Sequence, residues 1–213
     1  LLMIFGFISI LVSVPFIMVQ KDFKRLLAFS SIEHTGIIAL GFGFGGMYGV
    51  YGAELHAFSH AVVKSLLFFC AGNVFLKYKT REMDNIKGAI KIIPVTGVMF
   101  LIGIFAITGT PPFNIFLSEF LILADGFSSG KPLAIIFCSL VMIALVLIFV
   151  GFVYNMFKMI FGYSEPTPER GEMSKFTIVA MGFLLFFVLV VSIYVPPFLN
   201  KILQDIYNIV RNV

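Results

Sequence analysis

Long apolar runs alternate with short polar segments along the chain. Runs at about 1–19, 26–44, 51–76, 132–157 and 176–194 are each close to the ~20 residues that cross a bilayer as a helix. A further apolar segment, about 92–126, is too long for one straight crossing and is interrupted at residues 108–114. The pattern predicts an all-α polytopic membrane protein of about six transmembrane helices, one of them broken at Pro111 and Pro112.

The interruption has two interpretations. Proline removes backbone donors, and non-helical backbone at membrane depth is tolerated only where it is buried in protein or lines a cavity. Transporters commonly place ion sites near the membrane midplane at such interrupted helices, with a carboxylate beside the interruption. Here the interruption ends at Asn114, and Glu119 follows it. A broken helix with an ion site is therefore favoured. The alternative is a hairpin of two separate spans, with Pro111-Pro112 as an external turn and Glu119 in a structural pair.

The third apolar run carries three ionisable side chains on one helix face. His56, His60 and Lys64 follow one another at a spacing of four, so they stack along one stripe. Lys64 is near the middle of the run, where a lysine costs at least ~2.5–3.5 kcal/mol unless water or a partner relieves it. We interpret the stripe as part of an ion path. The alternative is that Lys64 pairs with a carboxylate for packing and both histidines are core residues.

Other acidic and basic groups lie on neighbouring turns. Glu33 and His34 give the second run a polar side, and Glu33 fits equally well as a structural ion pair or as a proton acceptor. Glu54 lies about one turn from the start of the third run. These residues are further candidates for the path.

Composition excludes a soluble enzyme. The chain is 60% hydrophobic, has 27 phenylalanines and is only 12% charged, whereas soluble domains are about 25% charged. The basic residues cluster in two loops, 21–25 with net +2 and 77–91 with net +3. The positive-inside rule places both loops in the cytoplasm, and no nucleic-acid site is indicated.

No metal site or disulfide is expected. Cys70 and Cys138 fall in separate apolar spans, without metal-ligand spacing. His56 and His60 lack the adjacent carboxylate of a metalloprotease pattern, and Lys64 on the same face would repel a cation.

We divide the chain into three parts. Residues 1–162 form one helical unit with the broken helix at about 92–126, residues 163–175 form a loop with Pro166 and Pro168, and residues 176–213 hold a final transmembrane helix and a tail. The tail has apolar residues at helical spacing, which suits a helix lying in the membrane interface. The chain begins inside an apolar run with no signal-peptide pattern, so we expect a longer parent polypeptide.

Four motifs support a family resemblance. In order along the chain they are DFKRLLAFSSIEHTG at 22–36, HAFSHAVVK at 56–64 followed by SLLFF, KTREMD at 79–84, and GTPPFNIFLSEF at 109–120. Together they resemble the antiporter-like, proton-translocating membrane subunits shared by respiratory complex I, group 4 membrane-bound NiFe hydrogenases and multisubunit cation/proton antiporters. The residues of the first and fourth motifs most resemble those of the hydrogenase-4 and formate hydrogenlyase type.

The resemblance implies a position for the chain within a larger fold. It places residues 1–162 on the second of two inverted repeats, with Pro111-Pro112 as the break, followed by one or two final helices. It implies that His56, His60 and Lys64 belong to a central hydrophilic axis, that Glu119 is the ionisable residue after the break, and that Asp22 and Lys24 lie in a loop at the cytoplasmic end. The first repeat is absent, so the chain should supply half of an ion path. Asn114 stands where the nearest relatives have glycine.

The function implied is a non-catalytic transport subunit of a redox-driven complex, either a membrane-bound hydrogenase or an NADH:quinone oxidoreductase-like enzyme in a prokaryotic cell membrane. Glu119 would load and release a proton (H⁺, with Na⁺/H⁺ exchange as an alternative), Lys64 would be the switchable charge, and His56 and His60 would relay. Glu33, His34 and Glu54 would complete the line. We expect no cofactor in this chain. Its partners would be lipid, other membrane subunits and a peripheral module with iron–sulfur clusters and NiFe or flavin. The alternatives are a stand-alone antiporter subunit and a structural membrane anchor.

Overall fold

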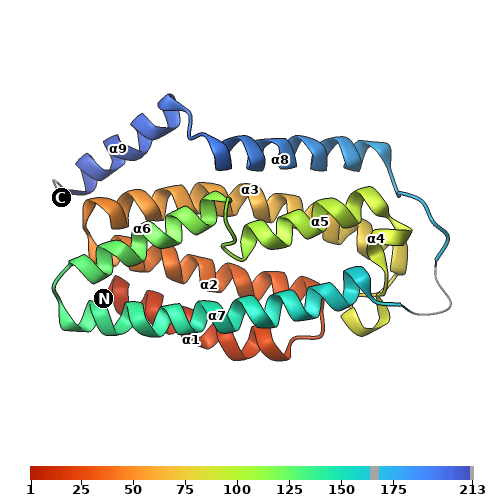
Figure 1. The fold of residues 1–213 in the computed structure, drawn as a ribbon, viewed down its shortest axis with the longest axis horizontal. Helices are drawn as coiled ribbons and strands as arrows, with labels where there is room; N and C mark the ends of the chain where they lie inside the picture. The colour runs from red at the N-terminus through yellow and green to blue at the C-terminus, as the bar shows by residue number, and fades with distance from the viewer. Residues whose placement is uncertain (164–167, 212–213) are drawn as a thin grey trace.

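The chain folds into a bundle of long helices that run along one common axis (Figure 1). The computed structural model describes residues 1–163 and 168–211. Its long helices are α1 (Leu2–Val19), α2 (Phe23–Phe44), α3 (Met47–Tyr78), α5 (Pro94–Ile107), α6 (Asn114–Ser128), α7 (Pro132–Phe161), α8 (Lys175–Ile193) and α9 (Pro197–Arg211). The short helices η1 (Met83–Asn85) and α4 (Ala89–Ile92) lie within the segment predicted as the second basic loop.

The predicted polytopic helical fold is confirmed. In the described part of the chain, α1, α2, α3, α7 and α8 are long and apolar enough to cross a membrane, and α5 is a shorter apolar helix. Helices α5 and α6 follow one another along the bundle axis, separated by residues 108–113 (Figure 1). The two therefore form one interrupted crossing, and the hairpin alternative is wrong.

Local signals explain several helix ends. The Asp22 carboxylate accepts hydrogen bonds from the backbone N–H groups of Lys24 (2.8 Å) and Arg25 (3.1 Å), which caps α2. Pro94 and Pro132 occupy the first turns of α5 and α7, where the missing N–H costs nothing. These signals fix where the membrane-depth segments begin.

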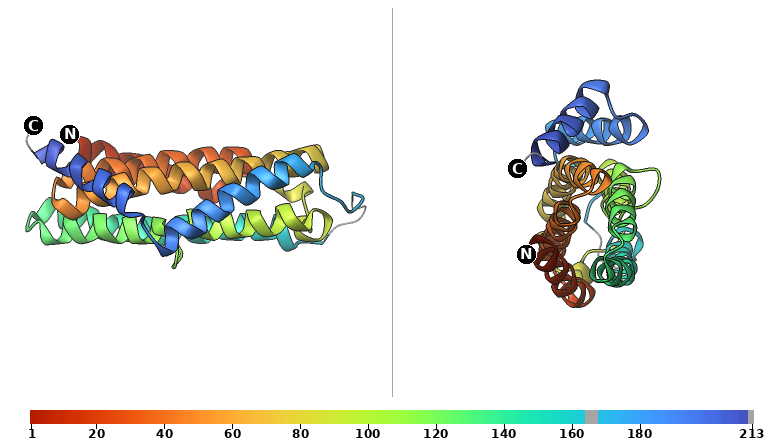
Figure 2. Two further views of the ribbon diagram at one scale, coloured as in Figure 1. Left: turned by 90° about the horizontal axis from the view of Figure 1, so that it is seen from above. Right: turned by 90° about the vertical axis from the view of Figure 1, so that its left-hand side faces the viewer.

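The helices form two rows. The end-on view of Figure 2 shows α1, α2 and α3 on one side and α7 with the α5–α6 pair on the other, with α8 and α9 across one end of both rows. Helix α3 packs against α2, α5, α6, α8 and α9. A side chain on α3 can therefore meet groups from both rows.

A glycine pair brings α2 and α3 into backbone contact. A Cβ on Gly41 would lie 2.6 Å from the carbonyl oxygen of Gly49, and a Cβ on Gly49 would lie 2.8 Å from that of Gly41. Both distances are shorter than real Cβ contacts, so neither position accepts a side chain without separating the helices. Small residues at such crossings are typical of helix packing in membranes.

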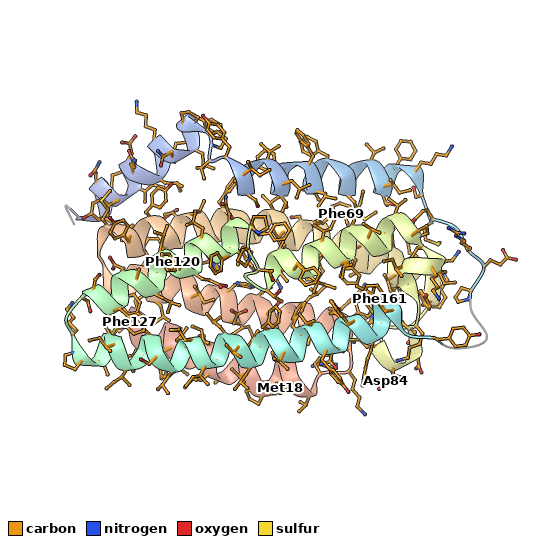
Figure 3. All side chains as sticks on the ribbon, in the orientation of Figure 1. Met18, Phe69, Asp84, Phe120, Phe127 and Phe161 are labelled. Carbon is orange, nitrogen blue, oxygen red and sulfur yellow. The ribbon has the colours of Figure 1, made fainter. Side chains whose placement is uncertain are left out.

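The outer surface is apolar, as a lipid-facing surface requires. Phe69 on α3, Phe120 on α6 and Phe161 on α7, which are labelled in Figure 3, are each about half exposed.

Helix α9 is held against the first half of α3. The Tyr51 hydroxyl and the Asn200 side-chain oxygen are 2.9 Å apart, and Leu55 packs with Leu199 and Leu203. Its predicted position in the membrane interface stays a prediction, as does the division of the chain into three parts.

The loop before α8 is attached to the start of α5. Pro166 lies outside the described residues. Beyond it, the Glu172 carboxylate accepts hydrogen bonds from the N–H groups of Val95 (2.8 Å) and Thr96 (3.1 Å) and from the Thr96 hydroxyl (2.6 Å). The Asn73 amide donates in turn to the Thr96 hydroxyl (3.1 Å), so this polar group ties α3, α5 and the loop together.

The glycine contact predicts a clear difference between two substitutions. Gly41→Ala should lower the free energy of unfolding by about 1–3 kcal/mol, because the new methyl group overpacks the α2–α3 crossing. Gly72→Ala on α3 is the matched control, since nothing lies within 4 Å of its added Cβ. Thermal unfolding of the protein in detergent measures both. Equal midpoints for the two variants would contradict the close α2–α3 contact.

Candidate functional site

Polar side chains from three helices meet inside the bundle. Helix α2 supplies Ser30, Glu33 and His34, helix α3 supplies His56, His60 and Lys64, and helix α6 supplies Ser118 and Glu119. Glu33, His34 and His56 thus lie beside the break that precedes α6. Glu33, His34, His56 and Lys64 are all buried.

The centre of the site is a hydrogen-bonded chain of two imidazoles. His34 Nδ1 and His56 Nε2 are 2.9 Å apart, and His56 Nδ1 is 2.9 Å from the Ser118 hydroxyl. On the other side, His34 Nε2 lies 3.4 Å from the Glu33 carboxylate. His56 therefore hydrogen-bonds through both ring nitrogens, and His34 adjoins the Glu33 carboxylate at ion-pair distance, so the line runs Ser118–His56–His34–Glu33 across α6, α3 and α2.

This line can move a proton without moving heavy atoms. A neutral imidazole donates from one nitrogen and accepts on the other, and which nitrogen carries the proton depends on the partners. A proton that enters at one end and leaves at the other exchanges the tautomers of both rings. The line thus has the chemistry of a short proton relay.

Lys64 is attached to the same region through α2. Its ammonium nitrogen lies 2.5 Å from both the Leu27 carbonyl oxygen and the Ser30 hydroxyl oxygen. In the part of the chain that the structure describes, the ion-pair contact within 4.0 Å in this region is that of His34 with Glu33, and Lys64 has none. The role of Lys64, in an ion path or in packing, stays a prediction.

A small cavity connects these groups. It has a volume of about 20 Å³ and is lined by Ser30, Glu33, His34, Thr108 and Glu119. Such a volume holds about one water molecule, and the lining offers the polar partners that a buried water needs.

The helix break positions Glu119. Gly109 has a positive φ of +64°, and a Cβ there would meet the Glu119 carboxylate. The carboxylate therefore lies against the interrupted backbone, which has no room for a side chain at this point. Glu119 also lines an outer cavity of about 350 Å³ with Thr108 and Gly109.

Asn114 fastens the break to the last transmembrane helix. Its amide donates to the Val191 carbonyl oxygen (2.7 Å), and its backbone N–H donates to the Ser192 hydroxyl (3.4 Å). Pro111 and Pro112 are exposed, with a cis bond between them. The asparagine that departs from the expected glycine thus has a contact that glycine cannot make.

Two predicted path residues lie at the margin of the cluster. His60 is half-buried, its ring centroid is 4.7 Å from that of His34, and its Nε2 is buried without a hydrogen-bond partner. Glu54 is half-buried and, among the described residues, has no hydrogen bond or ion pair to the cluster. Their roles in transport stay predictions.

The predicted loop residues have structural contacts. Asp22 caps α2, and its backbone pairs with that of Glu82. The Lys24 ammonium lies 4.6 Å from the centroid of the Phe75 ring, a cation–π contact. The structure does not bring either residue to the buried cluster.

Sequence reasoning did not single out Ser118. The signals for it were its place in the fourth motif and its position one residue before Glu119, in the second turn of α6.

The fold and the site define a polytopic helical membrane protein with ionisable groups beside a broken helix. The family model described as "NADH:quinone oxidoreductase/Mrp antiporter, TM" matches residues 1–145. The chain belongs to this family, as the four motifs indicated.

Individual relatives agree with this assignment. The chain is 32% identical over 199 residues to the "Hydrogenase-4 component F homolog" of Methylacidiphilum infernorum, covering 92% of this chain and 40% of the relative. It superposes on a chain of the archaeal membrane-bound sulfane sulfur reductase with a TM-score of 0.82 and 25% identity, covering 100% of this chain and 44% of that one. It superposes on a chain of the Mrp complex from Dietzia sp. DQ12-45-1b with a TM-score of 0.84 and 16% identity, covering 99% and 46%. The chain thus spans less than half the length of these relatives.

Proposed function

We propose that this chain is part of a proton-translocating membrane subunit of a redox-driven complex. The observation that carries the proposal is the buried line Ser118–His56–His34–Glu33, which lies beside a broken helix and a titratable lysine. Intramembrane ionisable residues mark ion paths and proton relays more often than packing. The family supports the same function, because its description names oxidoreductase and antiporter membrane domains.

In this proposal each group has a distinct role. Glu119 loads and releases the proton beside the break, and Lys64 is the charge that switches. A carboxylate that becomes charged near Lys64 favours its protonated form, and loss of that charge releases the proton. His56 and His34 relay between α3 and α2, and Glu33 receives the proton at the end of the line. His60 and Glu54 extend the line toward its ends.

The energy source and the cofactors would belong to partner subunits. Neighbouring membrane subunits, lipid and a peripheral module with iron–sulfur clusters, and with NiFe or flavin, would complete the assembly. The identity of 32% to a hydrogenase-4 component homolog supports a hydrogenase-type complex. The remainder of the parent protein, or a second polypeptide, would supply the other half of the ion path.

Substitutions at Lys64 and Glu119 test the path directly. Lys64→Met and Glu119→Gln in the full-length protein should lower proton transport into vesicles by about tenfold or more, because each removes a titratable group from a proton-transfer line. Lys131→Met and Glu169→Gln are the matched controls, since both residues are exposed and distant from the cluster in sequence. A structural anchor predicts wild-type transport in all four variants, and that result would refute the proposal.

A stand-alone antiporter subunit is the second candidate, because the fold also matches a chain of an Mrp complex with a TM-score of 0.84. The subunit composition of the native complex separates the two. We expect mass spectrometry of the purified assembly to identify an oxidoreductase module and at least one further membrane subunit. Purification with membrane antiporter subunits alone would replace the redox-driven function with the antiporter.

A further inference from the structure

The same buried cluster has the ligands of a transition-metal site. One ligand atom each of His34, His56 and Glu119 lies within 4.8 Å of the other two. Two imidazoles and one carboxylate are a common three-residue set for Zn²⁺, with the fourth position left to water. These three ligands come from α2, α3 and α6. They differ from the His56–His60 pair on a single helix, which the sequence analysis considered as a metal site and argued against.

The spacing of the two imidazoles fits a shared metal. Zn–N bonds of about 2.05 Å at a tetrahedral angle separate two nitrogens by about 3.3 Å. His34 Nδ1 and His56 Nε2 are now 2.9 Å apart and share a hydrogen. Binding would therefore separate the two nitrogens by about 0.4 Å. A Glu119 carboxylate oxygen lies within 4.8 Å of a ring nitrogen of each histidine.

The outer contacts of both imidazoles are those of metal ligands. A metal-bound histidine almost always uses its other ring nitrogen on a carboxylate, carbonyl or water, which fixes its orientation. His34 Nε2 faces the Glu33 carboxylate at 3.4 Å, and His56 Nδ1 faces the Ser118 hydroxyl at 2.9 Å. Both rings are therefore held with one nitrogen turned toward the other ring.

Charge and access also fit a divalent cation. A bound divalent cation favours the ionised forms of Glu33 and Glu119, whose two negative charges would then offset its own. The Lys64 ammonium donates to the Leu27 carbonyl and the Ser30 hydroxyl. Glu119 lines both the inner cavity and the outer cavity of about 350 Å³, which gives the ion an entry path.

We propose that His34, His56 and Glu119 bind a divalent transition-metal ion of the Zn²⁺ class. The ion takes the place of the hydrogen shared by His34 and His56 and so interrupts the imidazole line. Binding itself does not depend on the proposed function. The consequence that bound Zn²⁺ blocks proton transport does rest on it.

Zn²⁺ binding to the native complex containing the full-length protein tests the site. Equilibrium dialysis at equal free Zn²⁺ should show one tight equivalent that His34→Gln, His56→Gln and Glu119→Gln each weaken by about 10–100-fold or more, since loss of even an outer contact has effects of that size. Zinc X-ray absorption should show two nitrogen ligands with oxygen completing the shell. His60→Gln is the matched control, because its ring lies near His34 but outside the ligand set, and it should bind like the wild type.

The outcomes separate the site from the function. The metal site is overturned if the wild type holds no more Zn²⁺ than the His34→Gln/His56→Gln double variant, or if His60→Gln loses as much affinity as His56→Gln. Proton transport measured without zinc is an independent readout. If Zn²⁺ binds as expected while Lys64→Met and Glu119→Gln transport protons normally, the metal site stands and the proposed function fails.

Discussion

Burial of ionisable side chains at membrane depth is the constraint on which the rest of this structure depends. A polar group at membrane depth has no bulk water to hydrogen-bond, so burying it is costly unless another group of the protein bonds to it. The chain meets this requirement by connecting the groups to one another: His34 with His56, His56 with Ser118, and Lys64 with Ser30 and the Leu27 carbonyl. Each of these contacts crosses between helices, so the relative positions of α2, α3 and α6 matter to the site.

The packing of the helices serves those contacts. The Gly41–Gly49 contact brings α2 to α3, the pair of helices that carry the two bonded imidazoles. The break before α6 turns the Glu119 carboxylate against Gly109, and Asn114 joins the break to the end of α8. A shift of α8 would therefore act on the interrupted backbone, one turn from Glu119. This arrangement gives the C-terminal helices a physical connection to the buried cluster.

Sequence reasoning predicted the elements better than their contacts. The apolar runs gave the long helices and the break, since hydrophobic length and proline placement are local properties of the chain. The spacing of His56, His60 and Lys64 predicted one α3 stripe that faces the interior, and the structure places these residues there. The partners were not predictable, because the depth and rotation at which α2 and α6 cross α3 depend on packing between distant segments. The sequence left a carboxylate open as the partner of Lys64, whereas in the structure Lys64 donates to the Ser30 hydroxyl. The sequence did not indicate the contact of Ser118 with His56, nor that Asp22 caps α2.

The central claim is that His34 and His56 act as one proton-conducting unit, and a double-mutant cycle on proton transport tests it most directly. His34→Gln, His56→Gln and the double variant would be compared in vesicles containing the full-length protein. Residues that act as a unit are strongly non-additive, because the first substitution already breaks the line. We predict that the double variant transports protons no more slowly than the slower single variant. Losses that multiply, or single variants with wild-type transport, would contradict the account.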